Sequence, residues 1–190
     1  SNIGLGSNAV DSITTGDNNV GLGDNALTAV TSGDSNTAIG KDSLKTVTTS
    51  SDNTAIGRSS LNNNTGSSNT AVGRKALETN TTASNNTAVG YYALLGNTTG
   101  TGNVSVGIQA LQANTTASYN TAVGRLALNA NTTGADNTAL GNHAMGVNTT
   151  GSHNVAVGFG SLDANTTASY NTAVGRDALT ANTTGASNTA

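Results

Sequence analysis

One asparagine returns along the whole chain with a spacing of 17 residues, and this period constrains the fold more than any other feature. It occupies positions 2, 19, 36, 53, 69, 86, 103, 120, 137, 154, 171 and 188, and only the step from 53 to 69 is 16 residues. A fixed period of this kind is typical of repeat architectures. We number each coil from this asparagine, so that Asn120–Asp136, with the sequence NTAVGRLALNANTTGAD, is one typical coil.

Most positions of the coil accept only one kind of residue. Position two is Thr, Val or Ile, position three is Gly, Ala or Ser, and position four is Leu, Ile or Val. Position five is always Gly, position eight is Ala or Ser, and position thirteen is always Thr. Position nine is Leu except at Val10 and Met145. Positions six and seven accept almost any side chain, which is typical of a surface.

A 17-residue unit is too short for the helix-pair repeats, which need about 33 residues or more. It suits one turn of a parallel β-solenoid, so we predict an all-β fold of eleven coils in a single repetitive domain over residues 1–190. Coils stacked at strand spacing rise about 4.8 Å each, which gives a rod of about 50 Å. No capping segment is evident at either end, so we expect a piece of a longer fibre.

Alternation along the strand predicts which side chains face the interior. Positions two and four lie two residues apart and therefore point the same way, and their β-branched and aliphatic residues are typical of a buried strand face. We expect them to face the coil interior, and position three to face the opposite way. Position three is small in every coil, as in Ser105 and Ala122, so something must pack closely there: another protomer, or a second layer of the same coil.

The rest of the coil returns the chain to the next strand. Gly at position five ends the strand, through a positive φ or a close backbone approach, and positions eight and nine return to the core through Leu. We interpret the Asn-Thr-Thr-Gly segment as a turn with Asn and Gly in the left-handed region. The segment from position seven to position twelve fits either a second strand or irregular segment, or one helical turn ended by Asn.

Identical residues in successive coils form ladders along the stack. Asn ladders are favourable because side-chain amides hydrogen-bond along the stack, whereas like charges repel each other. The invariant columns are uncharged. The exception is position six in three consecutive coils, Lys41, Arg58 and Arg74, which we expect Asp24, Asp42 and other solvated groups to offset in part.

Composition excludes several classes of protein. Asn, Thr and Gly make up 85 of the 190 residues, seven Lys and Arg stand against ten Asp and Glu, and Cys, Pro and Trp are absent. A strongly basic nucleic-acid binder is thereby excluded, as are a disulfide scaffold and a cysteine metal site. No apolar run approaches the roughly 18–20 residues of a membrane span, so we expect no membrane contact by this segment.

The chain has few side chains of the types that catalysis or metal binding requires. The only imidazoles, His143 and His153, stand at different coil positions, and we interpret both as solvated. The ten acids are scattered, at Asp11, Asp17, Asp24, Asp34, Asp42, Asp52, Glu78, Asp136, Asp163 and Asp177. The Gly-Asp pairs of the first coils could suggest Ca²⁺, but the nonapeptide calcium motif is missing. We therefore predict a protein that is not an enzyme, with no catalytic, cofactor-binding or metal site and no cofactor.

Two further sets of side chains bear on recognition. The aromatic residues at variable columns should be exposed and available to a glycan or protein: Tyr91, Tyr92, Tyr119, Phe159 and Tyr170. Asn-Thr-Thr, formally a glycosylation sequence, occurs in seven coils, and a turn requirement explains it equally well. Its Thr columns at positions thirteen and fourteen also leave open an ice-binding face, although adjacent residues of an extended strand would point to opposite sides.

The N-T-A-V-G-x-x-A-L motif resembles the repeats of YadA-like heads in trimeric autotransporter adhesins. It resembles still more closely the N-T-A-V-G-x-x-A-L-x-x-N-T-T-G repeats of bacterial surface and phage tail-fibre proteins. The resemblance covers all eleven coils, although the adhesin-head repeat is typically 14 residues long. It implies a parallel β-roll that is one third of a trimeric fibre, displayed outside the cell, on the cell surface or on a virion.

These observations together predict a non-enzymatic structural and adhesive fibre segment. It would assemble as a homo-oligomer, a trimer by resemblance, and display variable side chains at positions six, seven and seventeen to a host-surface glycan or protein. An ice-binding solenoid and a purely structural filament without a receptor are the alternatives. No nucleic-acid partner is expected.

Overall fold

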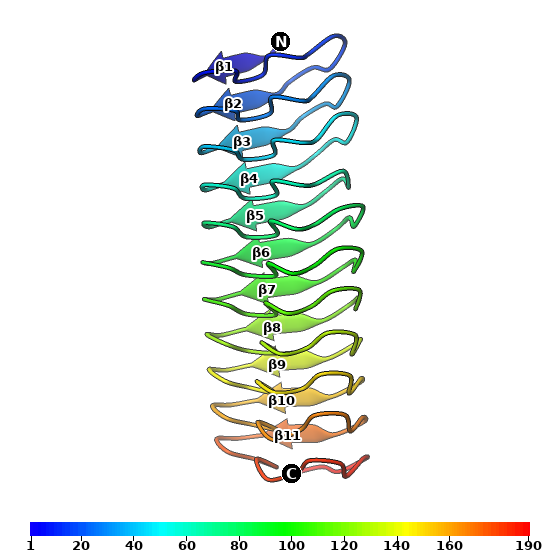
Figure 1. Ribbon diagram of the computed structural model, residues 1–190. Coiled ribbons are helices and arrows are strands. Elements are labelled where there is room, and N and C mark those ends of the chain that lie inside the picture. Colours follow the sequence, from blue (N-terminus) through cyan, green and yellow to red (C-terminus); the bar gives the residue numbers. More distant parts are fainter.

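The computed structural model describes residues 1–190 as a single stack of parallel coils, which runs from the N-terminus at the top of Figure 1 to the C-terminus at the bottom. Each coil contributes one three-residue strand to one eleven-stranded sheet, and each strand pairs with the next along the chain. The strands are β1 (Ile3–Leu5), β2 (Val20–Leu22), β3 (Thr37–Ile39), β4 (Thr54–Ile56), β5 (Thr70–Val72), β6 (Thr87–Val89), β7 (Val104–Val106), β8 (Thr121–Val123), β9 (Thr138–Leu140), β10 (Val155–Val157) and β11 (Thr172–Val174). The predicted β-solenoid is confirmed.

The register follows the 17-residue period. Between β8 and β9, for example, Ala122 pairs with Ala139. The 16-residue coil stays in register as well, because Thr54 pairs with Thr70 and the missing residue is the second Thr of the Asn-Thr-Thr segment. A loop position absorbs the deletion and the sheet continues unbroken.

The regular elements of the chain are all strands, so it has no helix that could cross a bilayer.

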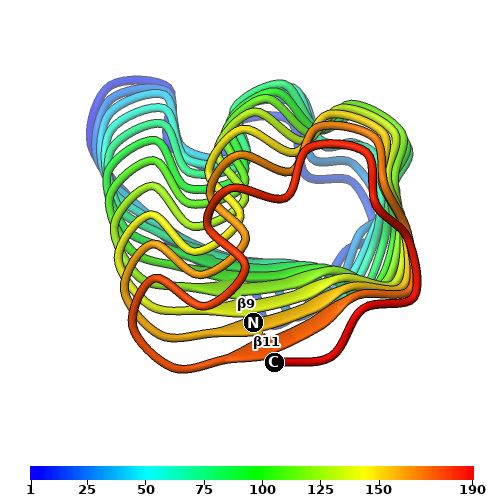
Figure 2. The same ribbon diagram turned by 90° about the horizontal axis from the view of Figure 1, so that it is seen from below.

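The prediction of which strand residues face the interior is wrong. Position three is completely buried, as at Ala122, whereas position four lies outside, with Val123 38% exposed. The alternation is as expected, but the two faces are exchanged. Position three is small because the second layer of the same coil packs against it: the leucine of position nine, Leu128 in this coil, fills the interior. Figure 2 shows how closely the wall opposite the strands approaches them.

The core is therefore a thin column. Its members are the small residues of positions three and eight and the Leu or Met of position nine, joined in the early coils by Val30 and Val47. A coil interior that is about one leucine deep has no room for two additional columns of β-branched side chains, because protein interiors are already close-packed. The return of position nine to the core is confirmed.

The wall opposite the strands is the irregular segment that the sequence left open, and it is neither a second strand nor a helical turn. Its positions seven and nine have positive φ, as in Leu126 (59°) and Leu128 (49°), and so has position seventeen on another edge of the coil, as in Tyr119 (60°). Such values are uncommon for residues other than glycine. Hydrogen bonds to neighbouring coils hold them: the Leu126 N–H donates to Ile108 O of the preceding coil, and the Leu128 N–H donates to Ala144 O of the following coil, both at 3.0 Å.

The turn chemistry expected for Asn-Thr-Thr-Gly is wrong in detail. Asn131 and Gly134, the first and last residues of one such segment, do not have positive φ. Position five, in contrast, requires glycine for both of the predicted reasons, a positive φ and a close approach of the neighbouring backbone. Gly124 has a φ of 135°, and a Cβ there would collide with the backbone carbonyl of Gly141 in the next coil.

Asn ladders are confirmed, and there are two of them, both buried. At position one, the Asn120 N–H donates to Asn103 Oδ1 across 2.9 Å, and Asn120 Nδ2 donates to Gly134 O across 3.0 Å. At position twelve, Asn131 Nδ2 donates to Asn114 Oδ1 and to the same Gly134 carbonyl. No buried side-chain polar atom lacks a partner. These ladders satisfy the loop backbone where the sheet does not reach.

Candidate functional site

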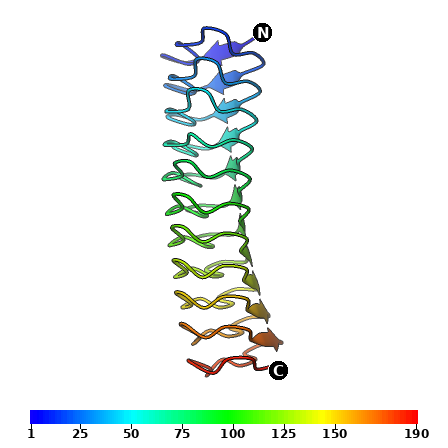
Figure 3. The ribbon, with the colours of Figure 1, turned by 90° about the vertical axis from the view of Figure 1, so that its right-hand side faces the viewer.

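The side chains of positions two and four lie on the outer side of the sheet and form a surface that we name the strand face. Its residues are Ile3, Leu5, Val20, Leu22, Thr37, Ile39, Thr54, Ile56, Thr70, Val72, Thr87, Val89, Val104, Val106, Thr121, Val123, Thr138, Leu140, Val155, Val157, Thr172 and Val174. None of them is charged. Figure 3 shows the strands of this sheet along one side of the rod, with the loops on the other.

The two columns of the strand face differ in chemistry. Position four is aliphatic in every strand, and Ile39, Val89 and Leu140 are 36%, 36% and 37% exposed. Position two is Thr in seven strands and Val or Ile in the other four. Soluble monomers rarely expose an apolar patch that extends beyond a few hundred Å², and larger patches mark interaction surfaces.

Position six carries an edge of variable side chains, as predicted. Lys41, Arg58 and Arg74 follow one another there, and none of them makes an ion pair. The neighbouring lysines do, because Lys45 lies 3.5 Å from Asp42 and Lys75 lies 3.1 Å from Glu78.

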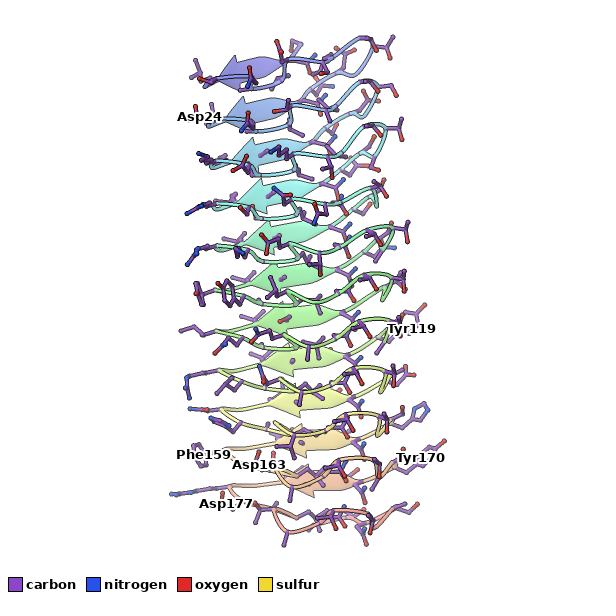
Figure 4. All side chains as sticks on the ribbon, in the orientation of Figure 1. Asp24, Tyr119, Phe159, Asp163, Tyr170 and Asp177 are labelled. Carbon is purple, nitrogen blue, oxygen red and sulfur yellow. The ribbon has the colours of Figure 1, made fainter.

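Two aromatic residues follow this basic column. The rings of Tyr91 and Tyr92 are stacked with their centroids 3.9 Å apart. The guanidinium of Arg74 lies 5.6 Å from the centroid of Tyr91, which is within the range of a cation–π contact. The lower half of the same edge carries Phe159, labelled on the left of Figure 4.

Position seventeen forms a second edge, on the other side of the rod in Figure 4. Tyr119 and Tyr170 project there and are 65% and 64% exposed, so the predicted exposure of these aromatics is confirmed. His153 stacks on Tyr170 with ring centroids 5.0 Å apart. Its Nδ1 lies 4.0 Å from Asp136 Oδ2.

The two histidines are not brought together. His143 stands at position seven and His153 at position seventeen, on different edges of the coil. The acids of the first coils accept hydrogen bonds along the stack: Asp34 Oδ1 accepts from the Asp17 N–H across 2.7 Å. No group of three or more His, Cys, Asp or Glu side chains lies close enough together to hold a metal ion.

The Asn-Thr-Thr segments serve the fold. Their asparagine side chains are buried inside the ladder of position twelve, with Asn97 and Asn114 completely inaccessible. The threonine hydroxyl of position thirteen is also engaged, because Thr98 Oγ1 donates to Thr115 O across 2.9 Å. Asn182, in the last coil, is the one member that is not buried. From Asn80 to Asn165 the folded chain therefore offers no accessible amide for glycosylation, and it offers no free hydroxyl column at position thirteen.

A cavity that the sequence analysis did not predict lies in the wall opposite the strands. It has a volume of about 220 Å³ and is lined by Leu126, Asn129, His143, Gly146, Val147 and Asp163. Gly146 occupies position ten, where the neighbouring coils have Asn129 and Asp163. The one signal available in the sequence was this glycine in a column of larger residues.

Comparisons of the chain with models of known protein families, with curated proteins and with solved structures found no match.

Proposed function

We propose that this chain is a segment of a non-enzymatic structural and adhesive fibre, in which several copies pack together through the strand face. Three is the number of copies that the sequence resemblance implies, and the same resemblance places the fibre outside the cell, on a cell surface or a virion. The variable side chains of positions six, seven and seventeen would be displayed to a host-surface glycan or protein.

The single observation that supports assembly most strongly is the aliphatic column of position four. A strand position that faces water in an isolated coil would be expected to hold polar residues in several of eleven coils, yet it holds none. Two positions in each of eleven strands give twenty-two side chains, within the roughly 20–30 residues per partner of a specific interface. The absence of charge on this face is also typical of an interface centre.

Assembly leaves the display surfaces free. Positions six, seven and seventeen lie on the edges and the loop side of the rod, away from the strand face. A rod whose backbone groups are paired between successive coils is stiff, and its buried Asn ladders fix the loops that hold the displayed residues. This combination suits a spacer that carries contact residues at fixed intervals.

The experiment that tests assembly measures mass by sedimentation equilibrium. We expect the chain to be trimeric, and the double variant Val106→Lys/Val123→Lys to be monomeric with unchanged circular dichroism, because it places two charges in the centre of the strand face. The matched control is Ile108→Lys/Asn142→Lys, which adds two charges at position six and should stay trimeric. A monomeric wild-type chain would contradict assembly, and a dimer would contradict the number three.

Ice binding is a second candidate, and we infer it for the strand face rather than for the Asn-Thr-Thr segments. The strand face presents seven threonines in one column beside an aliphatic column, on one side of a regular sheet, whereas the threonines of position thirteen are engaged in hydrogen bonds. An ice-binding face must stay exposed, so this function and assembly exclude each other. Thermal hysteresis of a monomeric chain, abolished in Thr121→Leu/Thr138→Leu, would favour ice binding over the fibre.

A further inference from the structure

The cavity at Gly146, which we name the notch, interrupts the wall formed by positions seven to eleven, and no backbone requirement explains its glycine. The φ of Gly146 is not positive. A Cβ added there would first meet Asp163 Oδ1, at 3.0 Å, which is the movable end of a side chain. In contrast, the glycines of position five have positive φ and nearly all of them abut the backbone of the next coil. A larger residue would fit at 146, so its absence leaves a space that the fold does not need.

Two polar side chains that line the notch, Asp163 and Asn129, have oxygen atoms that accept no hydrogen bond from the protein. No group of the protein donates a hydrogen bond to the Asp163 carboxylate. Asn129 uses its Nδ2 to bond Gln109 O across 2.9 Å, and its Oδ1 accepts no hydrogen bond. The notch is therefore flanked by free acceptors from the preceding and the following coil.

His143 supplies a donor to the same space. Its Nε2 lies 3.3 Å from Arg125 Nη1, and because arginine only donates, this contact is a hydrogen bond in the tautomer whose Nε2 accepts. Its proton then lies on Nδ1, and Nδ1 is the ring atom that faces the notch, 3.7 Å from where a Cβ of Gly146 would stand. Leu126 and Val147 complete the lining with apolar surface.

We propose that this notch binds one neutral pyranose unit of a glycan. Hydroxyls that both donate and accept match the free oxygens of Asp163 and Asn129 and the Nδ1–H of His143, and the C–H surface of the ring matches Leu126 and Val147. The volume of about 220 Å³ is several times the roughly 30 Å³ of a water molecule. It is smaller than the about 300–1,000 Å³ of pockets for drug-sized ligands, so a single ring fits. The unpaired carboxylate disfavours an acidic sugar.

The location suits a display site. Positions seven to eleven belong to the wall that Figure 2 shows opposite the strands, so the notch stays open when copies pack through the strand face. The choice of a glycan as ligand rests on the proposed adhesive function, but binding itself does not depend on assembly.

The test titrates the methyl pyranosides of glucose, galactose and mannose into the chain and follows backbone and imidazole NMR signals. We expect at least one of them to shift the Gly146 amide and the His143 ring. The variant Gly146→Asn, which restores the kind of residue that the column has at Asn129, should bind at least about tenfold more weakly. Asp163→Ala should also lose binding. The matched control is Thr180→Asn, a change at the same coil position outside the notch, which should bind as the wild type does.

Each outcome decides the proposal. Circular dichroism of Gly146→Asn identical to that of the wild type shows that lost binding is not lost folding. The proposal is overturned if none of the three pyranosides shifts these signals, or if Gly146→Asn binds them as the wild type does. Binding of sialic acid or of a simple amine alone would overturn the neutral-sugar assignment. A monomeric chain that binds a pyranoside would contradict assembly and leave the notch assignment standing.

Discussion

The side-chain amide of Asn114 donates from its Nδ2 to the Oδ1 of Asn97 in the preceding coil, across 2.9 Å, and both side chains are completely buried. Asn114 Nδ2 also donates to Ala117 O of its own coil, across 3.0 Å. One amide thus joins two coils and satisfies a loop carbonyl, and the next amide repeats the arrangement. A buried ladder of this kind is strong only while every member is present, because each partner left without a bond is away from water.

Asn114→Leu should therefore lower stability markedly. The variant leaves the buried Asn97 Oδ1 without its donor, whereas Ala117 O keeps its hydrogen bond from Asn103 Nδ2. A buried polar group without a partner costs about 1–3 kcal/mol. The midpoint of thermal unfolding, followed by circular dichroism, should fall. Thr116→Ala changes an exposed residue two positions further along and serves as the control, with a midpoint close to that of the wild type. Equal midpoints for the two variants would show that the ladder contributes nothing.

Ala122→Leu should destabilise each coil by overpacking. Ala122 is completely buried against the leucine column, and inserting a larger side chain into a close-packed core costs about 1–3 kcal/mol. The expected result is a lower melting midpoint, with any effect on assembly following only from the disturbed coil. Arg125→Leu, at the exposed position six, should be nearly neutral. An unchanged midpoint for Ala122→Leu would contradict a filled interior.

Gly124→Ala should be among the most damaging single-methyl changes in the chain. The residue has a φ of 135° and lies against the backbone of Gly141. A residue forced into a sparsely populated backbone region costs about 1–3 kcal/mol before the collision is counted. Gly146→Ala adds the same methyl group where φ is not positive and the neighbour is a movable carboxylate, so its melting midpoint should stay near that of the wild type. Similar midpoints for the two would refute the distinction.

Folding should need no divalent metal. The acids of the first coils accept hydrogen bonds along the stack, as Asp24 Oδ1 does from the Ser7 N–H across 3.1 Å, and these bonds do not need an ion. The circular dichroism spectrum in excess EDTA should equal that without it. A β signal that disappears in EDTA and returns with Ca²⁺ would contradict this prediction.

Acid should weaken the early coils through Asp42. A hydrogen bond from Asn25, together with the charges of Lys45 and Lys41, holds the pKa of Asp42 below its ordinary value of 3.8, against the effect of desolvation. A carboxyl whose pKa is lower in the folded state contributes stability above its unfolded pKa and loses it as the pH falls through the folded pKa. Between neutral pH and strong acid, Asp42→Asn should therefore lose less stability than the wild type does. An identical pH dependence of the two melting midpoints would contradict this.

Sequence alone determined the period, and the period determined the architecture. Seventeen residues with one short β-branched segment and an invariant glycine allow few folds other than a parallel solenoid, because each coil can complete its hydrogen bonds only on its neighbours. The burial of Leu128, the exposure of Tyr119 and the Asn ladders follow from the same reasoning. The notch was foreshadowed only by one glycine, Gly146, in a column of larger residues.

Only the tertiary structure decided which face of the strand is the inside. Alternation requires Ala122 and Val123 to point opposite ways but does not say which of them is buried, and hydrophobicity favoured the wrong one. The width of the interior settles the matter: with Leu128 turned inward by its positive φ, only a small residue fits opposite it, so the aliphatic column is left outside. Local preferences could not reveal this, because it depends on the distance between two walls of the coil that are several residues apart.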